Sequence, residues 1–303
     1  MLKATLLKAA ASPTLKRQVT SNPVAWRVAR RFIAGDRLDD AERTIRELNA
    51  AGISVALDHL GENTESHQQA RAAAAAYLAA LDRIQDEGLD ANISIKLTAL
   101  GLDLGADLAA EEAAKVAARG KEVGAMVGVD MESAGYVDRT LDLVASLQES
   151  YDDVGVCLQA YLHRTPDDLA RLDDLGVPVR LVKGAYQEPP EVAIQRKADV
   201  DAAYARLLEV LIRDNPYPMV ATHDEALVTR TKALVAAYRR DRSTFEFQML
   251  HGVRRDLQTQ VVAEGYRLRV YVPYGDQWYP YFMRRLAERP ANLYFFLSNL
   301  LKR

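Results

Sequence analysis

Short apolar runs that favour β-structure alternate along this chain with segments of helical periodicity, and no other feature constrains the fold as strongly. The helical segments include Glu65–Gln85, Ala106–Glu122, Val137–Gln148 and Glu225–Arg239. Strands separated by helices pair in parallel through crossover connections. The eight apolar runs are Ser54–Leu60, Asn92–Leu97, Ala125–Met131, Val154–Ala160, Val177–Lys183, Pro218–His223, Thr244–Leu250 and Arg267–Val272. Eight such units predict an α/β fold of the (βα)8 barrel type.

A doubly wound open sheet is the closest competing fold. Neither a G-x-G-x-x-G sequence nor a P-loop follows any of the eight runs, so the phosphate loop typical of such sheets is missing. Helical patterns at Val24–Ile33 and Asp40–Ala50 predict an N-terminal helical extension over about residues 1–50. No linker rich in Pro, Gly or Ser divides the 303 residues, and we therefore expect one domain over residues 1–303.

Charge and cysteine content narrow the range of partners. The formal net charge of -3 provides no general positive field for nucleic acid. A lone Cys157 cannot form an internal disulfide, which favours a reducing compartment. No apolar run approaches the roughly 20 residues that cross a bilayer, and the N-terminus lacks the apolar core of a signal peptide. We expect a cytoplasmic protein without a transmembrane segment that acts on a small molecule.

Polar residues stand at or near the ends of all eight predicted strands. Barrel enzymes place their chemistry at the carboxyl ends of the strands, so these side chains should meet at one mouth. Polar residues also gather wherever strands pass into loops, but eight such endings together favour a site. The residues are Asp58, Lys96, Asp130, Gln159, Lys183, His223, Gln248 and Tyr271.

Lys96 and Asp130 are the first candidates for chemistry. They could form a structural ion pair, hold a zwitterionic ligand by both charges, or transfer a proton. In the segment VRLVKGAYQEP, Arg180 and Lys183 lie three positions apart, so they should point in opposite directions unless the strand ends between them. Gly184 and Ala185 permit close approach of a phosphate or a ring system.

The segment after the eighth strand predicts a helix with Tyr281, Arg284, Arg285 and Glu288 on one face. One interpretation is an amphipathic helix with solvated charges. The sharper interpretation is that two neighbouring guanidinium groups bind a ligand carboxylate, with Tyr281 as a wall and Glu288 orienting an arginine. Neither H-x-H nor H-E-x-x-H spacing occurs, so no metal site is predicted.

Several fragments, in their order along the chain, resemble the proline dehydrogenase family, and in particular its short monofunctional bacterial members. They reach from the second predicted strand to the C-terminal helix. The fragments are SIKLTAL, VGVDMES, VCLQAY, VRLVKGAY, ATHDEAL, EFQMLHG, VYVPYG and YFMRRLAE. The resemblance implies a distorted (βα)8 TIM-type barrel that binds non-covalent FAD, with a C-terminal helix over the strand ends.

The same resemblance implies a role for each matching residue. Asp130 and Arg180 would be catalytic, with Arg180 near the reactive edge of the flavin. Substrate contacts would come from Lys96, Tyr186, Leu250, Tyr271, Tyr281, Arg284, Arg285 and Glu288. FAD contacts would come from Met131, Gln159, Arg180, Lys183, Gly184, Ala185, Lys197, Thr222 and His223. Gln187 departs from the long bifunctional members, which carry tryptophan there.

The implied reaction oxidises L-proline to 1-pyrroline-5-carboxylate, the first step of proline catabolism to glutamate. The resemblance also implies a quinone acceptor with peripheral contact at the inner membrane face, and pyrroline-5-carboxylate dehydrogenase as a partner. Tyr271 would crowd the substrate ring, which favours proline over hydroxyproline as the substrate. Two alternatives stay open at this point: an aldolase-type barrel with Lys96 or Lys183 as Schiff-base nucleophile, and a non-catalytic amino-acid-binding barrel.

Overall fold

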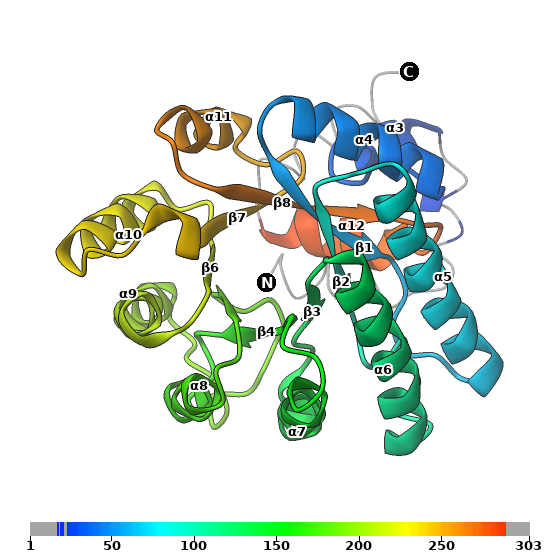
Figure 1. Ribbon diagram of the computed structural model, residues 1–303, viewed down its shortest axis with the longest axis horizontal. Helices are drawn as coiled ribbons and strands as arrows, with labels where there is room; N and C mark the ends of the chain where they lie inside the picture. The colour runs from blue at the N-terminus through cyan, green and yellow to red at the C-terminus, as the bar shows by residue number, and fades with distance from the viewer. Residues whose placement is uncertain (1–16, 18, 21–22, 289–303) are drawn as a thin grey trace.

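Eight parallel strands form a closed barrel in the computed structural model, which describes residues 17, 19–20 and 23–288 (Figure 1). Each strand pairs with the next in sequence, and β8 pairs with β1. The strands are β1 (Ser54–His59), β2 (Ala91–Ile95), β3 (Val127–Val129), β4 (Val154–Gln159), β5 (Val179–Val182), β6 (Pro218–Ala221), β7 (Glu246–Leu250) and β8 (Leu268–Tyr274). The predicted barrel is therefore confirmed, with all eight strands in the predicted places.

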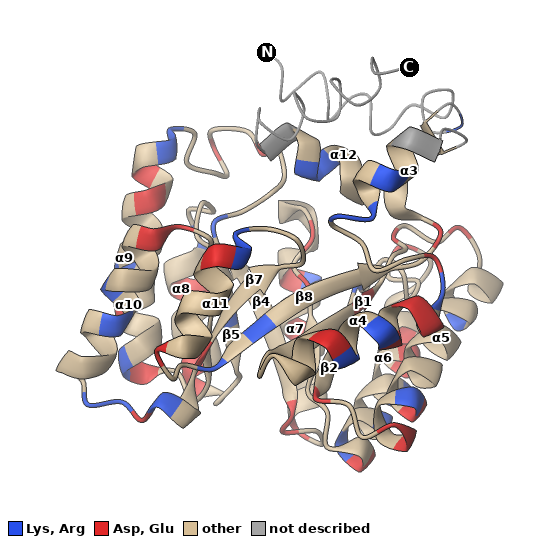
Figure 2. Cartoon of the chain, turned by 90° about the horizontal axis from the view of Figure 1, so that it is seen from above, with Lys and Arg blue, Asp and Glu red and all other residues tan. Residues whose placement is uncertain are grey.

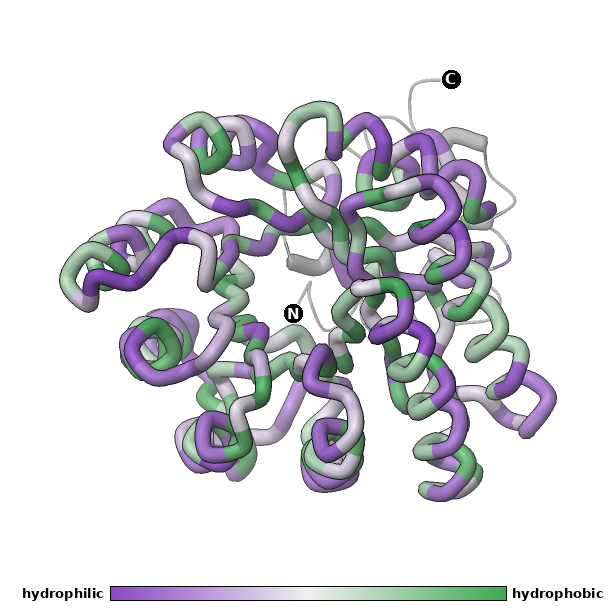
Figure 3. The backbone as a smooth tube through the Cα atoms, viewed as in Figure 1, coloured by the Kyte–Doolittle hydropathy of each residue, from purple (hydrophilic) through white to green (hydrophobic). Residues whose placement is uncertain are grey.

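Helices surround the barrel and connect its strands. They are α3 (Pro23–Ala29), α4 (Leu38–Ala50), α5 (His67–Asp86), α6 (Ala106–Val123), α7 (Val137–Gln148), α8 (Thr165–Asp174), α9 (Lys197–Asp214), α10 (Glu225–Ala237), α11 (Arg255–Ala263) and α12 (Trp278–Glu288). Short 3-10 turns cover Ala134–Tyr136 and Arg242–Thr244. Hydrophobic and hydrophilic positions alternate around α8 and α9, which are seen nearly end-on in Figure 3. Their apolar faces, such as Leu169 and Leu208, are buried in the main core.

The last helix does not take the usual place of an eighth barrel helix. Instead, α4 packs against β1 and β8 on the outside of the barrel, where Ala41 and Ile45 join the main core. Helix α12 lies with α3 above the strands (Figure 2). Trp278 and Phe282 of α12 share a second apolar cluster with α3. The predicted N-terminal helices and the helix over the strand ends are thus both present.

Strand and helix boundaries shift where backbone chemistry intervenes. The fifth strand was predicted from Val177 but begins at Val179, since Pro178 has no N–H for a sheet ladder. The third spans only Val127–Val129, because the chain turns toward a loop at Asp130. The helix predicted over Val24–Ile33 ends at Ala29, and the following segment bonds to the end of β8 through Ala34 N–H and the carbonyl of Pro273, 2.9 Å apart.

Candidate active site

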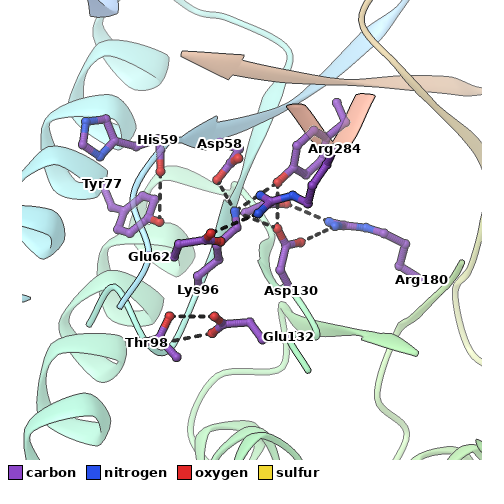
Figure 4. Close-up of polar contacts among 12 residues, drawn as sticks. Asp58, His59, Glu62, Tyr77, Lys96, Thr98, Asp130, Glu132, Arg180 and Arg284 are labelled. Carbon is purple, nitrogen blue, oxygen red and sulfur yellow. Dashed lines mark hydrogen bonds and ion pairs between the residues drawn. The ribbon is translucent and has the colours of Figure 1, made fainter. Parts of the chain in front are cut away.

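Five residues from the carboxyl-terminal ends and interior of the strands form a buried cluster, which we call the inner cluster. Its members are Asp58, Lys96, Asp130 and Arg180, which are labelled in Figure 4, and Tyr271. Lys96 Nζ lies 2.8 Å from Asp58 Oδ1 and 3.2 Å from Asp130 Oδ2. Arg180 Nη1 lies 2.5 Å from Asp130 Oδ1, and the Tyr271 hydroxyl donates to Asp130 Oδ2 at 2.7 Å. Asp130 is therefore the carboxylate at which two cations and a phenol converge.

Opposite charges within the inner cluster shift the pKa values of Lys96 and Asp130 so that both groups stay charged. Burial alone would lower the pKa of Lys96, but Asp58 in particular, with Tyr271 and Asp130, raises it well above its ordinary value. Burial alone would raise the pKa of Asp130, but Lys96 and Arg180 hold it below its ordinary value. Lys96 therefore stays an ammonium ion and Asp130 a carboxylate. A permanently charged lysine is a poor Schiff-base nucleophile, which argues against the aldolase alternative at this position.

Arg180 and Lys183 contact different sets of residues, as their spacing of three positions predicted. Arg180 lies within β5 and reaches the barrel interior, where Nη2 donates to Ser94 Oγ at 2.8 Å. Lys183 lies beyond the end of β5 and pairs with Asp201 and Asp224, at 2.6 and 2.9 Å. The strand ends between the two basic residues, at Val182.

Helix α12 carries two arginines, and Arg284 reaches the barrel mouth. Arg284 Nη1 lies 3.0 Å from Glu62 Oε1, and Arg284 points toward Lys96 and Asp130 (Figure 4). The Arg285 guanidinium carbon lies 5.2 Å from the centre of the Tyr281 ring. The helix is not a solvated amphipathic surface element, since Tyr281 and Leu286 are buried and Arg284 is only partly exposed. Glu288 ends the helix, but its side chain lies outside the described residues.

Tyr186 and Leu250 complete the surroundings of this mouth. Burial raises the pKa of the Tyr186 hydroxyl, and the charges of Arg284 and Glu62 also act on it, which places Tyr186 beside that pair. Leu250 pairs in register with Tyr271 on the neighbouring strand. All substrate candidates whose side chains are described thus gather near the inner cluster or on the helix above it.

The remaining candidates lie on the β3 to β6 side of the mouth. Gln159 is buried and donates from Nε2 to the carbonyl of Glu132 at 2.9 Å, while His223 Nε2 accepts from Leu250 N–H at 2.8 Å. Met131 is buried, and Thr222 Oγ1 accepts from Asp224 N–H at 3.1 Å.

A pocket of about 420 Å³ opens on this side. It is lined by Tyr161, Lys183, Gly184, Tyr186, Gln187, Glu188, Ile194, Gln195, Lys197, Val200 and Asp201. Gly184 has φ of 118°, and a Cβ there would lie 2.3 Å from the Tyr161 ring, so glycine is required. Lys183 and Lys197 both pair with Asp201 at the pocket. Lys183, Gly184 and Lys197 thus contribute to one pocket, as a shared ligand would require.

The sequence did not single out Glu62, the carboxylate partner of Arg284. It follows β1 by three residues, which is the one signal that could have placed it at the mouth. Asp58 was noted only as a polar strand ending, although it is fully buried and holds Lys96. Thr98 and Glu132, which hydrogen-bond beside the mouth, were also missed.

A parallel (βα)8 barrel with a buried charge cluster and a helix that directs Arg284 toward it defines a barrel enzyme for a small charged molecule. The comparisons with known proteins give the particular family. The family model for proline dehydrogenase matches residues 41–297. The chain is 42% identical over 282 residues to proline dehydrogenase of Deinococcus radiodurans, and 40% identical over 275 residues to proline dehydrogenase 1 of Bacillus subtilis, with 91% of both chains covered in each case. The chain belongs to the proline dehydrogenase family, as the resemblance indicated.

Longer proteins share the same barrel. The chain is 28% identical to the bifunctional protein PutA of Escherichia coli, where 87% of this chain matches 23% of that protein. The crystal structure of proline utilization A from Bdellovibrio bacteriovorus, inactivated by N-propargylglycine, superposes with a TM-score of 0.81 at 25% identity and covers 87% of this chain and 33% of that one. The identity and the share of the relative that is matched are thus both higher for the proline dehydrogenases of Deinococcus radiodurans and Bacillus subtilis than for PutA.

Proposed function

We propose that this chain uses non-covalently bound FAD to oxidise L-proline to 1-pyrroline-5-carboxylate. The observation that carries the proposal is the position of Arg284, which points from α12 toward the inner cluster at the strand ends. An amino acid between them meets guanidinium groups from above and the Lys96 ammonium from below. Family membership supplies the reaction, and the described residues supply a site of matching charge.

The substrate is held by charge at one end and by apolar contact at the other. Lys96, Arg284 and Arg285 bind the carboxylate, because fixed guanidinium forks match its two oxygens. Tyr186, Leu250, Tyr271 and Tyr281 enclose the pyrrolidine ring and exclude water. This arrangement fixes the position of the ring carbon next to nitrogen relative to the strand ends. Such orientation lowers the barrier to hydride transfer from that carbon. Glu288, which we expected to orient an arginine, has its side chain outside the described residues.

Asp130 and Arg180 lie nearest to the reacting atoms in this proposal. FAD held beside Arg180 would supply the acceptor for the hydride that leaves the substrate carbon. Arg180 favours the negative charge that the flavin gains, and Asp130 holds Arg180, Lys96 and Tyr271 in fixed positions. The Nε atom of Arg180 is buried and has no hydrogen-bond partner among the described residues. A cationic donor in this state fits an electron-rich ring system in contact with it.

The residues on the β3 to β6 side suit the rest of the cofactor. Lys183 and Lys197 provide cations for phosphate groups at the pocket, where they now share Asp201. The required glycine at position 184 lets the backbone approach a ligand closely. The further contacts in this proposal are Met131, Gln159, Ala185, Thr222 and His223, all on this side of the mouth.

The wider setting of the reaction follows from the family rather than from the site. We propose a quinone as electron acceptor, reached through peripheral contact with the inner face of the membrane, and a cytoplasmic location. No helix among the described residues is long and apolar enough to cross a membrane. The product would pass to pyrroline-5-carboxylate dehydrogenase on the way to glutamate. The chain from residue 1 to 303 would work as one flavin-binding domain.

The absorption spectrum of the purified protein tests this proposal directly. After reconstitution with FAD, the protein should show a flavin band that L-proline bleaches without oxygen. Glycine, which lacks the ring, is the control and should leave the band unchanged. A protein that cannot be reconstituted with FAD, or whose band survives L-proline, would rule out the proposed function. Borohydride trapping in the presence of a carbonyl substrate would instead support a lysine nucleophile.

A further inference from the structure

A second group of hydrogen bonds lies beside the inner cluster, on the loops after β2 and β3, just beyond Lys96 and Asp130. The buried side chain of Glu132, three residues after the end of β3, meets buried Thr98, three residues after the end of β2. Glu132 Oε1 accepts from Thr98 N–H at 3.1 Å, and Oε2 accepts from the Thr98 hydroxyl at 2.6 Å (Figure 4). Both oxygens of one buried carboxylate are therefore committed to a single threonine.

Thr98 in turn holds the loop between β1 and α5, residues 60–66. Its Oγ1 accepts from Asn63 N–H at 3.1 Å, and its carbonyl accepts from Thr64 N–H at 3.2 Å and from Thr64 Oγ1 at 3.0 Å. Asn63 adopts a positive φ of 55°, a strained conformation for a residue other than glycine. Strain of this kind persists only where surrounding contacts fix it, and here those contacts come from Thr98.

Glu62 directly precedes Asn63 and Thr64, the two loop residues that Thr98 holds. On its other side, Leu60 N–H donates to the carbonyl of Tyr274 at 2.8 Å, so the loop is fixed on both sides of Glu62. Glu62 then pairs with Arg284 at 3.0 Å. A continuous path of contacts runs from Glu132 through Thr98 and the loop to the arginine on α12.

Glu132 is itself held from the opposite direction. Gln159 Nε2 donates to the carbonyl of Glu132, and Ala134 N–H donates to Glu188 Oε1 at 2.7 Å. The loop after β3 is thus tied to β4 and to the loop after β5. Thr98 therefore bonds to the side chain of a residue whose backbone is fixed, which is the property that a positioning group needs.

We propose that Glu132 and Thr98 are positioning residues that set the location of Glu62, and through it the orientation of Arg284, for the substrate carboxylate. The proposal rests on the proposed function of Arg284. Glu62 holds one edge of the guanidinium and leaves its other N–H groups for the ligand. Loss of the Thr98 hydroxyl removes its hydrogen bonds with Asn63 N–H and Glu132 Oε2 together and leaves only the backbone contacts of Thr98, and Glu62 then no longer aligns Arg284.

Replacing Thr98 by valine keeps its shape and removes the hydroxyl. For Thr98→Val we expect the KM for L-proline to rise about fivefold, while kcat changes less than about twofold, because binding rather than transfer is affected. The calorimetric Kd of tetrahydrofuran-2-carboxylate, which keeps the ring and the carboxylate but has no amine, should rise by a similar factor. Thr98→Ser retains the hydroxyl and should restore both values. A KM and a Kd within twofold of the original protein would overturn the proposal.

A double-mutant comparison separates positioning from a general structural effect. In a Glu62→Ala background, Thr98→Val should change the KM no further, since the group that it positions is absent. An equal additional rise in that background would show that Thr98 acts by another route and would refute the proposal. Thr231→Val is the matched control, because Thr231 is fully buried and its hydroxyl donates to the carbonyl of Leu227, on α10. It should leave the KM unchanged.

A gentler variant covers the case in which Thr98→Val fails to fold. Thr64→Val removes only the loop-side hydroxyl, which is partly exposed, and should raise the KM about twofold, again only when Glu62 is present. No rise would count against the positioning role. The original protein distinguishes this result from failure of the proposed function. If L-proline does not bleach its flavin, the proposed function is wrong. If bleaching is normal but the variants keep the original KM, only the positioning role of Glu132 and Thr98 is ruled out.

Discussion

The inner cluster and helix α12 bring charge to the same ligand position in two different ways. The ion pairs of Lys96 and Arg180 in the inner cluster join side chains that are between 1% and 13% exposed. Above them, Arg284 and Glu62 are 18% and 24% exposed, and the helix that carries Arg284 packs on an apolar cluster with α3. Buried ion pairs are costly to separate, whereas partly exposed ones exchange partners more readily. The inner cluster is therefore suited to fixed orientation and α12 to ligand-dependent contact.

Asp130→Ala should produce the largest effect. The change leaves the buried Arg180 without its carboxylate, while Lys96 keeps Asp58, and an unpaired buried charge costs about 3–5 kcal/mol. Urea denaturation should show a loss of unfolding free energy of that order, and turnover of L-proline should fall about a hundredfold or more. Asp142→Ala is the control, since Asp142 pairs with Arg171 on the surface. Equal stability of the two variants would contradict the difference between buried and exposed pairs.

Arg284→Met should affect binding rather than stability. A charged hydrogen bond to the substrate carboxylate is lost, which corresponds to a rise of about 30- to 100-fold in the KM for L-proline. The unfolding free energy should change by less than about 1 kcal/mol, because the pair with Glu62 is partly solvated. Arg285→Met should act in the same direction. An unchanged KM in both variants would rule out the carboxylate clamp.

The sequence predicted the inner cluster better than the surroundings of α12, for a physical reason. Strand periodicity and the polar residues at strand ends place Lys96 and Asp130 at one mouth, because parallel strands all end on the same side. The barrel itself follows from the same alternation. Contacts between residues at strand ends depend on regular secondary structure, which produces a periodic pattern of apolar residues in the sequence.

The partners of α12 depend on loops and on chain segments distant in sequence. Glu62 and Arg284 are separated by 222 positions, and no periodicity relates them. Glu288, which shares a helix face with Arg284, was the only partner that the pattern could suggest. Likewise, α4 takes the outer position beside β8, and this releases α12 to lie over the mouth. A local pattern predicts a helix but not the surface on which it packs.

Trp26→Ala tests how firmly α12 is held from above. The rings of Trp26 on α3 and Trp278 on α12 are 5.1 Å apart, and Trp278 also meets Phe282 edge-on. An aromatic pair contributes about 0.5–1.5 kcal/mol, so its loss should raise the KM for L-proline about threefold while kcat is retained. Tyr238→Ala, an exposed aromatic residue after α10, should have no effect. A fall in kcat with constant KM would show that α3 influences the inner cluster instead.

Salt should distinguish the two regions without any mutation, with the smallest effect. Raising the ionic strength from about 0.05 to 0.5 M shortens the screening length from about 14 to 4 Å, which weakens partly exposed charge contacts and leaves buried ones nearly unchanged. The KM for L-proline should therefore rise about twofold, with kcat constant. In Arg284→Met this dependence should flatten, since the exposed contact is already gone. The same salt dependence in Arg284→Met as in the original protein would assign the screened contact to another charge, and the contrast between the inner cluster and α12 would then lose its electrostatic basis.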